Sequence, residues 1–290
     1  MARPEAPPAP GGLRPSEVVR RSADYLARHG VESPRATAES LLMHFLGSDR
    51  AGLYSRAEGL DTRTAKLFGR ALCQRCGGVP LQYLTGDQPF MGLRLQVGPG
   101  VFVPRPETEI LVEEVLRLVA GVSVPVVVDV GTGSGAVALA VKHGRPDARV
   151  LATDVAEGPV RLAMANAARL GLEVEVLRGD LLSPLPEDLR GRVDLIASNP
   201  PYVAREDYES LPSEVKAEPY EALVGGTDVH RRLVEEAGRW LRPSGWLVLE
   251  IGADQGEAVA DLLAGTFDDV EVLPDLAGRD RVVRGRRPGP

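Results

Sequence analysis

Two different spacings of apolar residues divide the chain. From residue 15 to about residue 84, apolar positions recur every three or four residues, which predicts amphipathic helices joined by short connections. Ser16 and Ser33 are expected to cap the first two helices, Gly47 to end the second, and Asp61–Gly77 to form a third. Consecutive helices of this kind predict a small all-α bundle.

The spacing changes between residues 86 and 105, where apolar residues are separated by Gly, Pro and polar residues. This pattern is typical of short strands and turns, and it predicts a β-hairpin that joins two domains. The apolar positions concerned are Phe90, Leu93, Leu95, Val97, Val101 and Val103. A helix is expected to begin near Glu107.

From Val124 onwards, short apolar runs alternate with amphipathic stretches. The run VPVVVDV is apolar at nearly every position, as expected for a strand that is buried on both faces of a parallel sheet. Later strand-like runs end at Asp154, Asp180 and Ser198, and helical stretches separate them. The alternation predicts an α/β domain with a doubly wound, mostly parallel sheet, whose ligands bind beyond the carboxyl ends of the strands.

These patterns together give an expected division of the chain. It consists of a disordered tail over residues 1–14, a helical domain over 15–85, a hairpin linker over 86–105 and the α/β domain over 106–290. The tail is rich in Pro and Ala and lacks the apolar core of a secretion signal.

The formal net charge of the 290 residues is -7, and it is unevenly distributed. Residues 1–105 carry 14 Lys and Arg against 9 Asp and Glu, whereas the remainder carries 20 against 32. The acidic second part argues against a face made for duplex DNA, because DNA binding depends on neutralising phosphates. The mildly basic first part can meet an acidic partner, although a solvated surface is the simpler interpretation.

No segment has the character of a membrane span. The longest apolar stretches are about ten residues, short of the ~20 that a spanning helix needs. Cys73 and Cys76 form a single CxxC without the further ligands of a structural zinc site, so we interpret them as ordinary half-buried thiols. These features predict a reduced, cytoplasmic protein with no metal site.

A glycine-rich turn, DVGTGSGA, follows the first predicted strand of the α/β domain. Gly131, Gly133 and Ala136 fit the G-x-G-x-x-A pattern, in which glycines allow a close approach of backbone and ligand. Asp154 can accept the ribose hydroxyls of an adenosine-containing ligand, and Asp180 is either an acceptor for an adenine amino group or a helix N-cap. The turn alone does not separate a nicotinamide cofactor from S-adenosylmethionine.

The motif SNPPY at the end of the fourth strand does separate them. Pro200 and Pro201 cannot donate backbone hydrogen bonds and each fixes its own φ, so Asn199 lies in a rigid setting. The nitrogen of a planar –NH2 group is a poor nucleophile because its lone pair is delocalised. The Asn199 side-chain oxygen and the Pro200 carbonyl can each accept one of its N–H groups and stabilise the positive charge that grows on methylation. Tyr202 can pack on the flat group.

Six segments together resemble the release-factor glutamine N5-methyltransferases (HemK/PrmC type), which are class I S-adenosylmethionine-dependent methyltransferases. They are FVPRPETE, DVGTGSGAVALA, SNPPYVA, EPYEALVGG, LEIGADQGEAV and DLAGRDRVV. The order of a small helical domain, a hairpin and a catalytic domain is also similar to that family. The resemblance implies a Rossmann-like methyltransferase sheet and a small N-terminal all-α domain.

The resemblance also implies a reaction and its residues. The family methylates N5 of the glutamine in the Gly-Gly-Gln motif of bacterial class 1 peptide chain release factors. The implied cofactor-binding residues are Phe102, Arg105, Asp129, Gly131, Thr132, Gly133, Gly135, Asp154, Val155, Asp180, Leu181 and Asn199, and Glu107 is expected to support Phe102 and Arg105. The implied substrate-binding residues are Asn199, Pro200, Pro201 and Tyr202, with Asn199, Pro200 and Tyr202 acting in catalysis. The helical domain and hairpin would hold the release factor, and the protein is expected to be a monomer without stable nucleic-acid partners.

Three other interpretations use the same motifs. An adenine-N6 or guanine-N2 nucleic-acid methyltransferase would place a flipped or single-stranded base at SNPPY, and it predicts a basic cleft there. A cofactor-binding adaptor would keep the SNPPY segment without catalysing a reaction there, and a nicotinamide dehydrogenase would have no use for this segment. His230 is expected at a helix start rather than as a base, and the acidic stretch REDYESLPSE as a solvated loop rather than a metal site.

Overall fold

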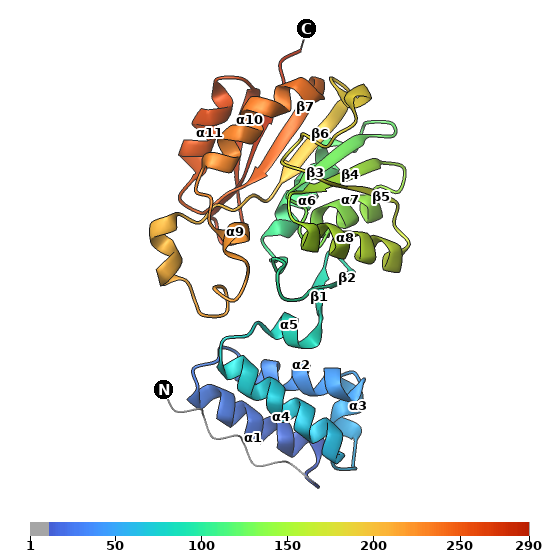
Figure 1. The fold of residues 1–290 in the computed structure, drawn as a ribbon, viewed down its shortest axis with the longest axis vertical. Coiled ribbons are helices and arrows are strands. Elements are labelled where there is room, and N and C mark those ends of the chain that lie inside the picture. Colours follow the sequence, from blue (N-terminus) through green and yellow to red (C-terminus); the bar gives the residue numbers. More distant parts are fainter. Residues whose placement is uncertain (1–11, 290) are drawn as a thin grey trace. The chain divides into compact units, whose positions relative to one another are not determined.

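Residues 12–289 are described by a computed structural model, in which the chain divides into two units (Figure 1). The helical unit contains the chain up to Gly86 together with Pro212–Ala217, and the sheet unit contains Asp87–Leu211 and the chain from Glu218 onwards. The tail expected over residues 1–14 lies outside the described residues except for its end.

The helical unit confirms the helices expected from the apolar spacing and adds two short ones. Its elements are α1 (Pro15–Arg28), α2 (Pro34–Leu46), α3 (Arg50–Ser55), α4 (Thr62–Cys76) and α5 (Leu81–Thr85). Their apolar stripes meet in one core, which includes the fully buried Leu26, Leu41, Leu42 and Phe68. Helices α3 and α5 are too short to produce a periodic pattern, so they could not be predicted from apolar spacing.

The expected helix caps are partly wrong. Helix α1 begins two residues earlier than expected, with Pro15 as its first residue and Arg14 before it, so Ser16 lies inside the helix. Ser33 does precede α2, but its φ is 46° and its side chain makes no capping hydrogen bond. Gly47 ends α2 in the left-handed conformation, as expected.

A short segment from the second half of the chain, Pro212–Ala217, belongs to the helical unit. The guanidinium of Arg75, 10% exposed, forms an ion pair with Glu214. A side-chain carbon at Gly78 would lie 3.0 Å from Ser213 Oγ, so the absence of a side chain there lets the segment approach. The chain that follows SNPPY is therefore held by the helical unit before it returns to the sheet unit.

The sheet unit is built on a seven-stranded sheet with the order β5-β4-β3-β6-β7-β9-β8. Its strands are β3 (Val126–Val130), β4 (Arg149–Asp154), β5 (Val174–Arg178), β6 (Val193–Ser198), β7 (Leu241–Glu250), β8 (Asp268–Pro274) and β9 (Asp280–Arg286). Strands β3 to β7 pair in parallel, whereas β9 is antiparallel to both β7 and β8. The α/β, doubly wound and mostly parallel fold is therefore confirmed.

Helices cover both faces of this sheet. They are α6 (Thr108–Leu118), α7 (Ala136–Gly144), α8 (Glu157–Leu170), α10 (Asp228–Trp240) and α11 (Gly256–Ala264). The short helix α9 (Tyr220–Leu223) and 3-10 turns at Glu187–Leu189 and Arg205–Ser210 lie in the connections. Successive strand residues face opposite sides, so Val127 joins the core under α6 and α7 while Val128 joins the core under α10 and α11.

The hairpin is shorter than expected. Strands β1 (Asp87–Phe90) and β2 (Leu93–Gln96) pair with each other and belong to the sheet unit. Val97, Val101 and Val103 are buried but lie outside any strand. Within residues 12–289, no helix is both long and apolar enough to cross a membrane.

Candidate active site

The sequence-predicted residues meet where β3, β4 and β6 end. These strands are neighbours in the order β4-β3-β6, and they are parallel, so their carboxyl ends lie at one edge of the sheet. The chain continues from β3 to β4 on one side and later adds β6 on the other side of β3. A reversal of this kind opens a crevice above the central strand, which is the usual ligand site of such sheets.

The glycine turn between β3 and α7 keeps its ligand side open. Gly131, Gly133 and Gly135 have φ values of 73°, 58° and 87°, which side-chain-bearing residues rarely adopt. An added Cβ at Gly131 would meet no atom within 4 Å, whereas one at Gly135 would lie 2.9 Å from Leu139 Cδ1. The first glycine therefore borders free space, and the third allows close packing of the helix that follows.

The backbone donors of this turn are directed into the protein. The N–H groups of Gly131 and Thr132 both donate to the Thr153 carbonyl, each over 2.9 Å. The N–H of Gly133 donates to Asp154 Oδ2 over 3.0 Å. The turn is thus tied to the end of β4, and these three N–H groups hold its shape.

Asp129 and Thr132 form a buried link below the turn. Asp129 Oδ2 accepts hydrogen bonds from Thr132 Oγ1 (2.6 Å) and from the N–H of Ala138 in α7 (3.1 Å). Burial raises the pKa of Asp129 to about 6, although both hydrogen bonds act to lower it. Asp129 and Thr132 therefore connect the turn to α7 by hydrogen bonds.

Asp154 is fixed in one orientation at the end of β4. Besides the bond from Gly133, its Oδ1 accepts the N–H of Ala156 over 2.9 Å. Burial raises the pKa of this carboxyl, and the backbone N–H groups oppose the rise. Each carboxylate oxygen has more than one lone-pair site, so both can still accept a hydroxyl from a ligand.

The neighbouring candidates differ in their surroundings. The Val155 side chain is 64% exposed, which is unusual for valine and leaves an apolar surface beside Asp154. Leu181 has a φ of 48°, and its carbonyl accepts the Thr153 hydroxyl over 2.8 Å. Asp180 is more than half exposed and its Oδ2 already accepts Arg232 Nη2 over 2.5 Å. Asp180 makes no helix cap.

Asn199 lies at the end of β6 and its amide is held from behind. Its Nδ2 donates to Thr108 Oγ1, the first residue of α6, over 3.1 Å. Because the amide nitrogen is used there, the Oδ1 atom is directed away from Thr108. Ser198 fixes the strand end beside the glycine turn, since its hydroxyl donates to the Val130 carbonyl over 2.7 Å. Pro200 is buried, whereas Pro201 and Tyr202 are partly exposed.

Two later segments hold the backbone of this motif. The Tyr202 carbonyl accepts Gln255 Nε2 over 2.8 Å. The N–H groups of Gly225 and Gly226 both donate to the Val203 carbonyl over 3.1 Å. A Cβ at Gly225 would lie 2.3 Å from the Pro201 carbonyl oxygen, so only glycine fits. Burial also raises the pKa of the Tyr202 hydroxyl to about 12, which keeps it protonated.

Phe102 and Arg105 are joined to a buried acid that the sequence did not single out. The Arg105 guanidinium lies 5.0 Å from the centre of the Phe102 ring. Glu218, almost fully buried, forms an ion pair with Arg105 and accepts the Val103 N–H over 2.9 Å. Glu218 lies within EPYEALVGG, but its partners are more than a hundred residues away, so spacing gave no signal. Glu107, expected to support this pair, is exposed at the start of α6.

His230 lies near the start of α10, as expected, and is fully buried. Its Nε2 donates to the Glu250 carbonyl over 2.9 Å. Burial lowers the pKa of the imidazole, so it is neutral at pH 7. In the described part of the chain, no group of three or more His, Cys, Asp or Glu residues is placed to hold a metal ion. Cys73 and Cys76 are free thiols on α4.

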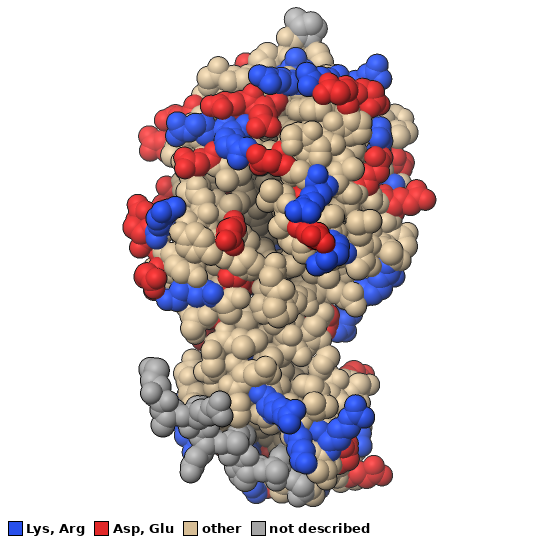
Figure 2. Space-filling model, in the orientation of Figure 1, with Lys and Arg blue, Asp and Glu red and all other residues tan. Residues whose placement is uncertain are grey.

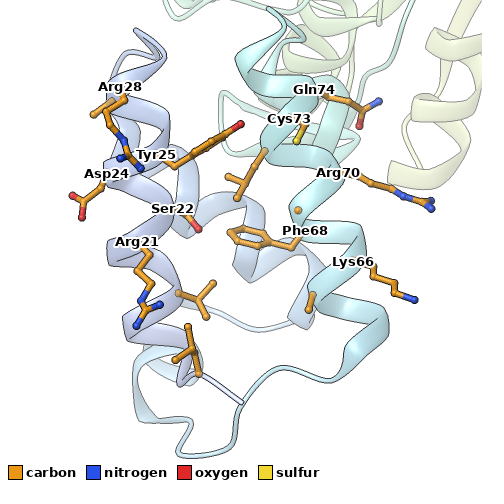
Figure 3. A pocket seen from close by; sticks show the side chains of 16 residues that line it. Arg21, Ser22, Asp24, Tyr25, Arg28, Lys66, Phe68, Arg70, Cys73 and Gln74 are labelled. Carbon is orange, nitrogen blue, oxygen red and sulfur yellow. The ribbon is translucent and has the colours of Figure 1, made fainter. Parts of the chain in front are cut away.

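A separate hollow of about 1220 Å³ lies in the helical unit, between α1 and α4. Figure 3 shows Tyr25 and Phe68 projecting between the two helices, with Arg21 and Arg28 on the α1 side. Its lining is mainly apolar with basic residues around it, and it contains none of the residues at the sheet edge. It is therefore separate from the residues at the sheet edge.

Comparison with known proteins covers both units. A model of the PrmC N-terminal domain matches residues 17–86, and a model of the methyltransferase small domain matches residues 98–278. The release factor glutamine methyltransferase of Moorella thermoacetica is 45% identical over 274 residues, covering 91% of this chain and 94% of that protein. The one of Geobacter sulfurreducens is 40% identical over 276 residues, covering 93% and 95%.

Solved structures of other proteins share the fold of the sheet unit. The T. thermophilus 16S rRNA N2 G1207 methyltransferase superimposes with a TM-score of 0.53 and 23% identity, over 69% of this chain and 49% of that chain. At this identity the similarity concerns the fold alone, which is the doubly wound sheet described above.

Proposed function

This chain belongs to the release factor glutamine methyltransferase family, and we propose that it transfers a methyl group from S-adenosylmethionine to N5 of the glutamine in the Gly-Gly-Gln motif of peptide chain release factors. The family is the one that the sequence motifs resemble. The observation that carries the proposed chemistry is the position of Asn199, held by Thr108 at the strand end next to the glycine turn.

The residues at the ends of β3 and β4 fit an adenosine-containing ligand. Asp154, fixed by two backbone N–H groups, would accept the two ribose hydroxyls. The exposed Val155 side chain and Leu181 would pack on the adenine, and the open space at Gly131 would take the chain that carries the sulfur. Bound here, S-adenosylmethionine would supply an electrophilic methyl group.

Asn199 and Pro200 would prepare the substrate nitrogen. The Oδ1 of Asn199 and the carbonyl of Pro200 would each accept one N–H of the glutamine amide, which fixes the direction of its nitrogen. The same two oxygens would stabilise the positive charge that grows on nitrogen as its bond to the methyl carbon forms and the sulfur–methyl bond breaks, which would leave neutral S-adenosylhomocysteine. The methylated nitrogen is strongly acidic and releases one proton to water, so no protein base is required.

The remaining residues would enclose the amide. Tyr202 would lie against its flat face, and its high pKa keeps the phenol neutral beside the reacting nitrogen. Arg105 and Phe102 would cover the cofactor, with Glu218 holding both Arg105 and the backbone of Val103. Exclusion of water by such a cover strengthens the polar contacts inside the site.

We assign release-factor recognition to residues 15–85 and the hairpin, and catalysis to residues 106–290. The hollow between α1 and α4 offers apolar surface bordered by Arg21, Arg28, Lys66 and Arg70, which suits an acidic and partly apolar protein surface. On the face in Figure 2, Lys and Arg of the sheet unit are interspersed with Asp and Glu rather than gathered into a continuous track. This favours a protein substrate over a nucleic-acid strand.

The test is transfer of labelled methyl from S-adenosylmethionine to a purified release factor. A matched release factor with the motif glutamine changed to alanine, total RNA and total DNA serve as parallel substrates. We expect label on the wild-type factor alone. Label on nucleic acid alone would instead show that the SNPPY segment binds a nucleic-acid base. Label on the Gln→Ala factor would show that another residue is modified.

A further inference from the structure

We propose that Glu250 is a positioning residue for the methyl transfer, acting through Thr108 on the Asn199 amide. This inference deepens the proposed function and rests on it. Glu250 lies outside the residues assigned to cofactor or substrate above, and it is a fully buried carboxyl at the edge of the sheet where the reaction is placed.

The strand register places Glu250 beside Asn199. Ser198 of β6 pairs with Leu249 of β7 in a parallel ladder. Asn199 follows β6 directly, and Glu250 is the last residue of β7. Parallel neighbours are about 5 Å apart, so the two residues leave the sheet side by side. Thr108 is also buried. Its Oγ1 accepts a hydrogen bond from Asn199 Nδ2, and its hydroxyl is near enough to lower the pKa of the Glu250 carboxyl.

The Glu250 carboxyl is unusual because it is buried without a full hydrogen-bond partner. Among the described residues, neither of its oxygens has a partner at ordinary hydrogen-bond geometry. A buried polar group left in this way is costly, and few occur in a folded protein. The Thr108 hydroxyl is the nearby donor available to it, and its influence lowers the pKa of Glu250.

The charged and titratable groups that surround Glu250 come from four elements. They are Arg281 on β9, Arg105 and Glu107 before α6, Tyr202 after β6, and His230 on α10, whose ring bonds the Glu250 backbone carbonyl. Burial raises the pKa of Glu250 to about 7, with Glu107 adding to the rise and Thr108, Arg281 and Arg105 opposing it. Both protonation states are therefore accessible near neutral pH.

The ionised carboxylate would strengthen the site through a chain of hydrogen bonds. Thr108 O–H would donate to Glu250, while Thr108 Oγ1 accepts the Asn199 N–H, so each bond polarises the next. The negative charge at one end increases the electron density on Asn199 Oδ1 at the other. Oδ1 then binds the substrate N–H more strongly as positive charge grows on the nitrogen. When Glu250 is protonated, this effect is lost while the geometry remains.

The test compares the wild type with Glu250→Gln over pH 6 to 9, with S-adenosylhomocysteine affinity and thermal unfolding as controls for the fold. Gln keeps the size and an acceptor for Thr108 but cannot ionise. We expect the kcat of Glu250→Gln to be about tenfold below wild type at pH 8.5 and close to it at pH 6. Equal kcat values at all pH, or a constant ratio across the range, would overturn the proposal.

A second pair of variants tests the link itself. Thr108→Val removes the hydroxyl and should lower kcat at least as much as Glu250→Gln, whereas Thr108→Ser should restore most of it. Unchanged activity in Thr108→Val would exclude transmission through this residue. If the wild type itself fails to label the glutamine, the proposed function fails first, and that result is distinct from an active wild type whose variants show no pH-dependent ratio.

Discussion

Replacement of Asn199 by alanine is the sharpest perturbation of the proposed chemistry. The substitution removes one of two acceptors for the substrate amide and leaves the other, the Pro200 carbonyl, in place. It also removes the Asn199 Nδ2 group, which donates a hydrogen bond to Thr108 Oγ1 over 3.1 Å. The backbone of the strand end is still held by Ser198, so the fold of the site should survive.

The expected size of the effect follows from the preorganised geometry. One fixed polar contact to a developing charge contributes about 3 kcal/mol, which corresponds to a loss of roughly 100-fold in rate. In the proposed arrangement the cofactor is held by Asp154 and the glycine turn, whereas the Asn199 side chain bonds Thr108. The affinity for S-adenosylhomocysteine should therefore change by less than about threefold, equivalent to about 0.6 kcal/mol.

The assay is single-turnover methyl transfer to a release factor at saturating enzyme and S-adenosylmethionine. It reports the chemical step without product release. Calorimetric titration with S-adenosylhomocysteine and a thermal unfolding curve are the controls. A single-turnover rate within threefold of wild type would refute the role given to Asn199, and so would a rate loss that is matched by an equal loss of cofactor affinity.

Three further predictions concern other parts of the molecule. Asp154→Ala should weaken S-adenosylhomocysteine binding by tenfold or more, because hydrogen bonds to charged groups contribute about 1.5–3 kcal/mol. The kcat at saturating cofactor should fall less. Titration calorimetry measures the affinity, and steady-state kinetics measure kcat. Glu218→Gln should loosen the segment at Arg105, raise KM for S-adenosylmethionine and speed proteolysis next to Arg105; unchanged values for both would contradict the covering role. The pKa of Glu39 is lowered to about 2, first by the Tyr54 hydroxyl and then by its arginine partners. Ionised Glu39 should therefore stabilise the helical unit fully at a pH above 4.5, the ordinary pKa of a glutamate, and this stabilisation should be lost as the pH falls toward 2. Glu39→Gln should therefore lower the Tm at pH 7 by the equivalent of about 1–3 kcal/mol and by much less at pH 2.5; the same loss at both pH values would show that ionisation is not involved.

The chemical motifs could be found from the sequence because each is local. SNPPY combines the end of a buried strand with two residues that restrict the backbone, and both signals lie within a few positions. Asp154 and the glycine turn likewise follow directly from strands that were recognisable as apolar runs. Since parallel strands place their carboxyl ends at one edge of a sheet, the sequence was enough to predict that Gly131, Asp154 and Asn199 lie near one another.

The partners of these residues could not be found in the same way. Thr108 lies 91 residues from Asn199, and Glu218 lies 113 residues from Arg105. Gln255 reaches the Tyr202 carbonyl from 53 residues away. Hydrogen bonds of this kind depend on where a helix start or loop is packed, and apolar periodicity carries no information about that. The direction of the turn's N–H groups, inward to Thr153 and Asp154, was equally inaccessible.

By itself, then, the sequence determined the order of the longer helices and of the strands, the parallel sheet and the restricted backbone around Asn199, because these depend on neighbouring residues and on strand direction. Only the tertiary structure decided which atom of the Asn199 amide bonds Thr108, that Glu218 holds Arg105 and the Val103 backbone, and that Glu250 is buried near Thr108. These features require the positions of atoms from segments far apart in the chain, which become fixed only when helices and sheet pack together.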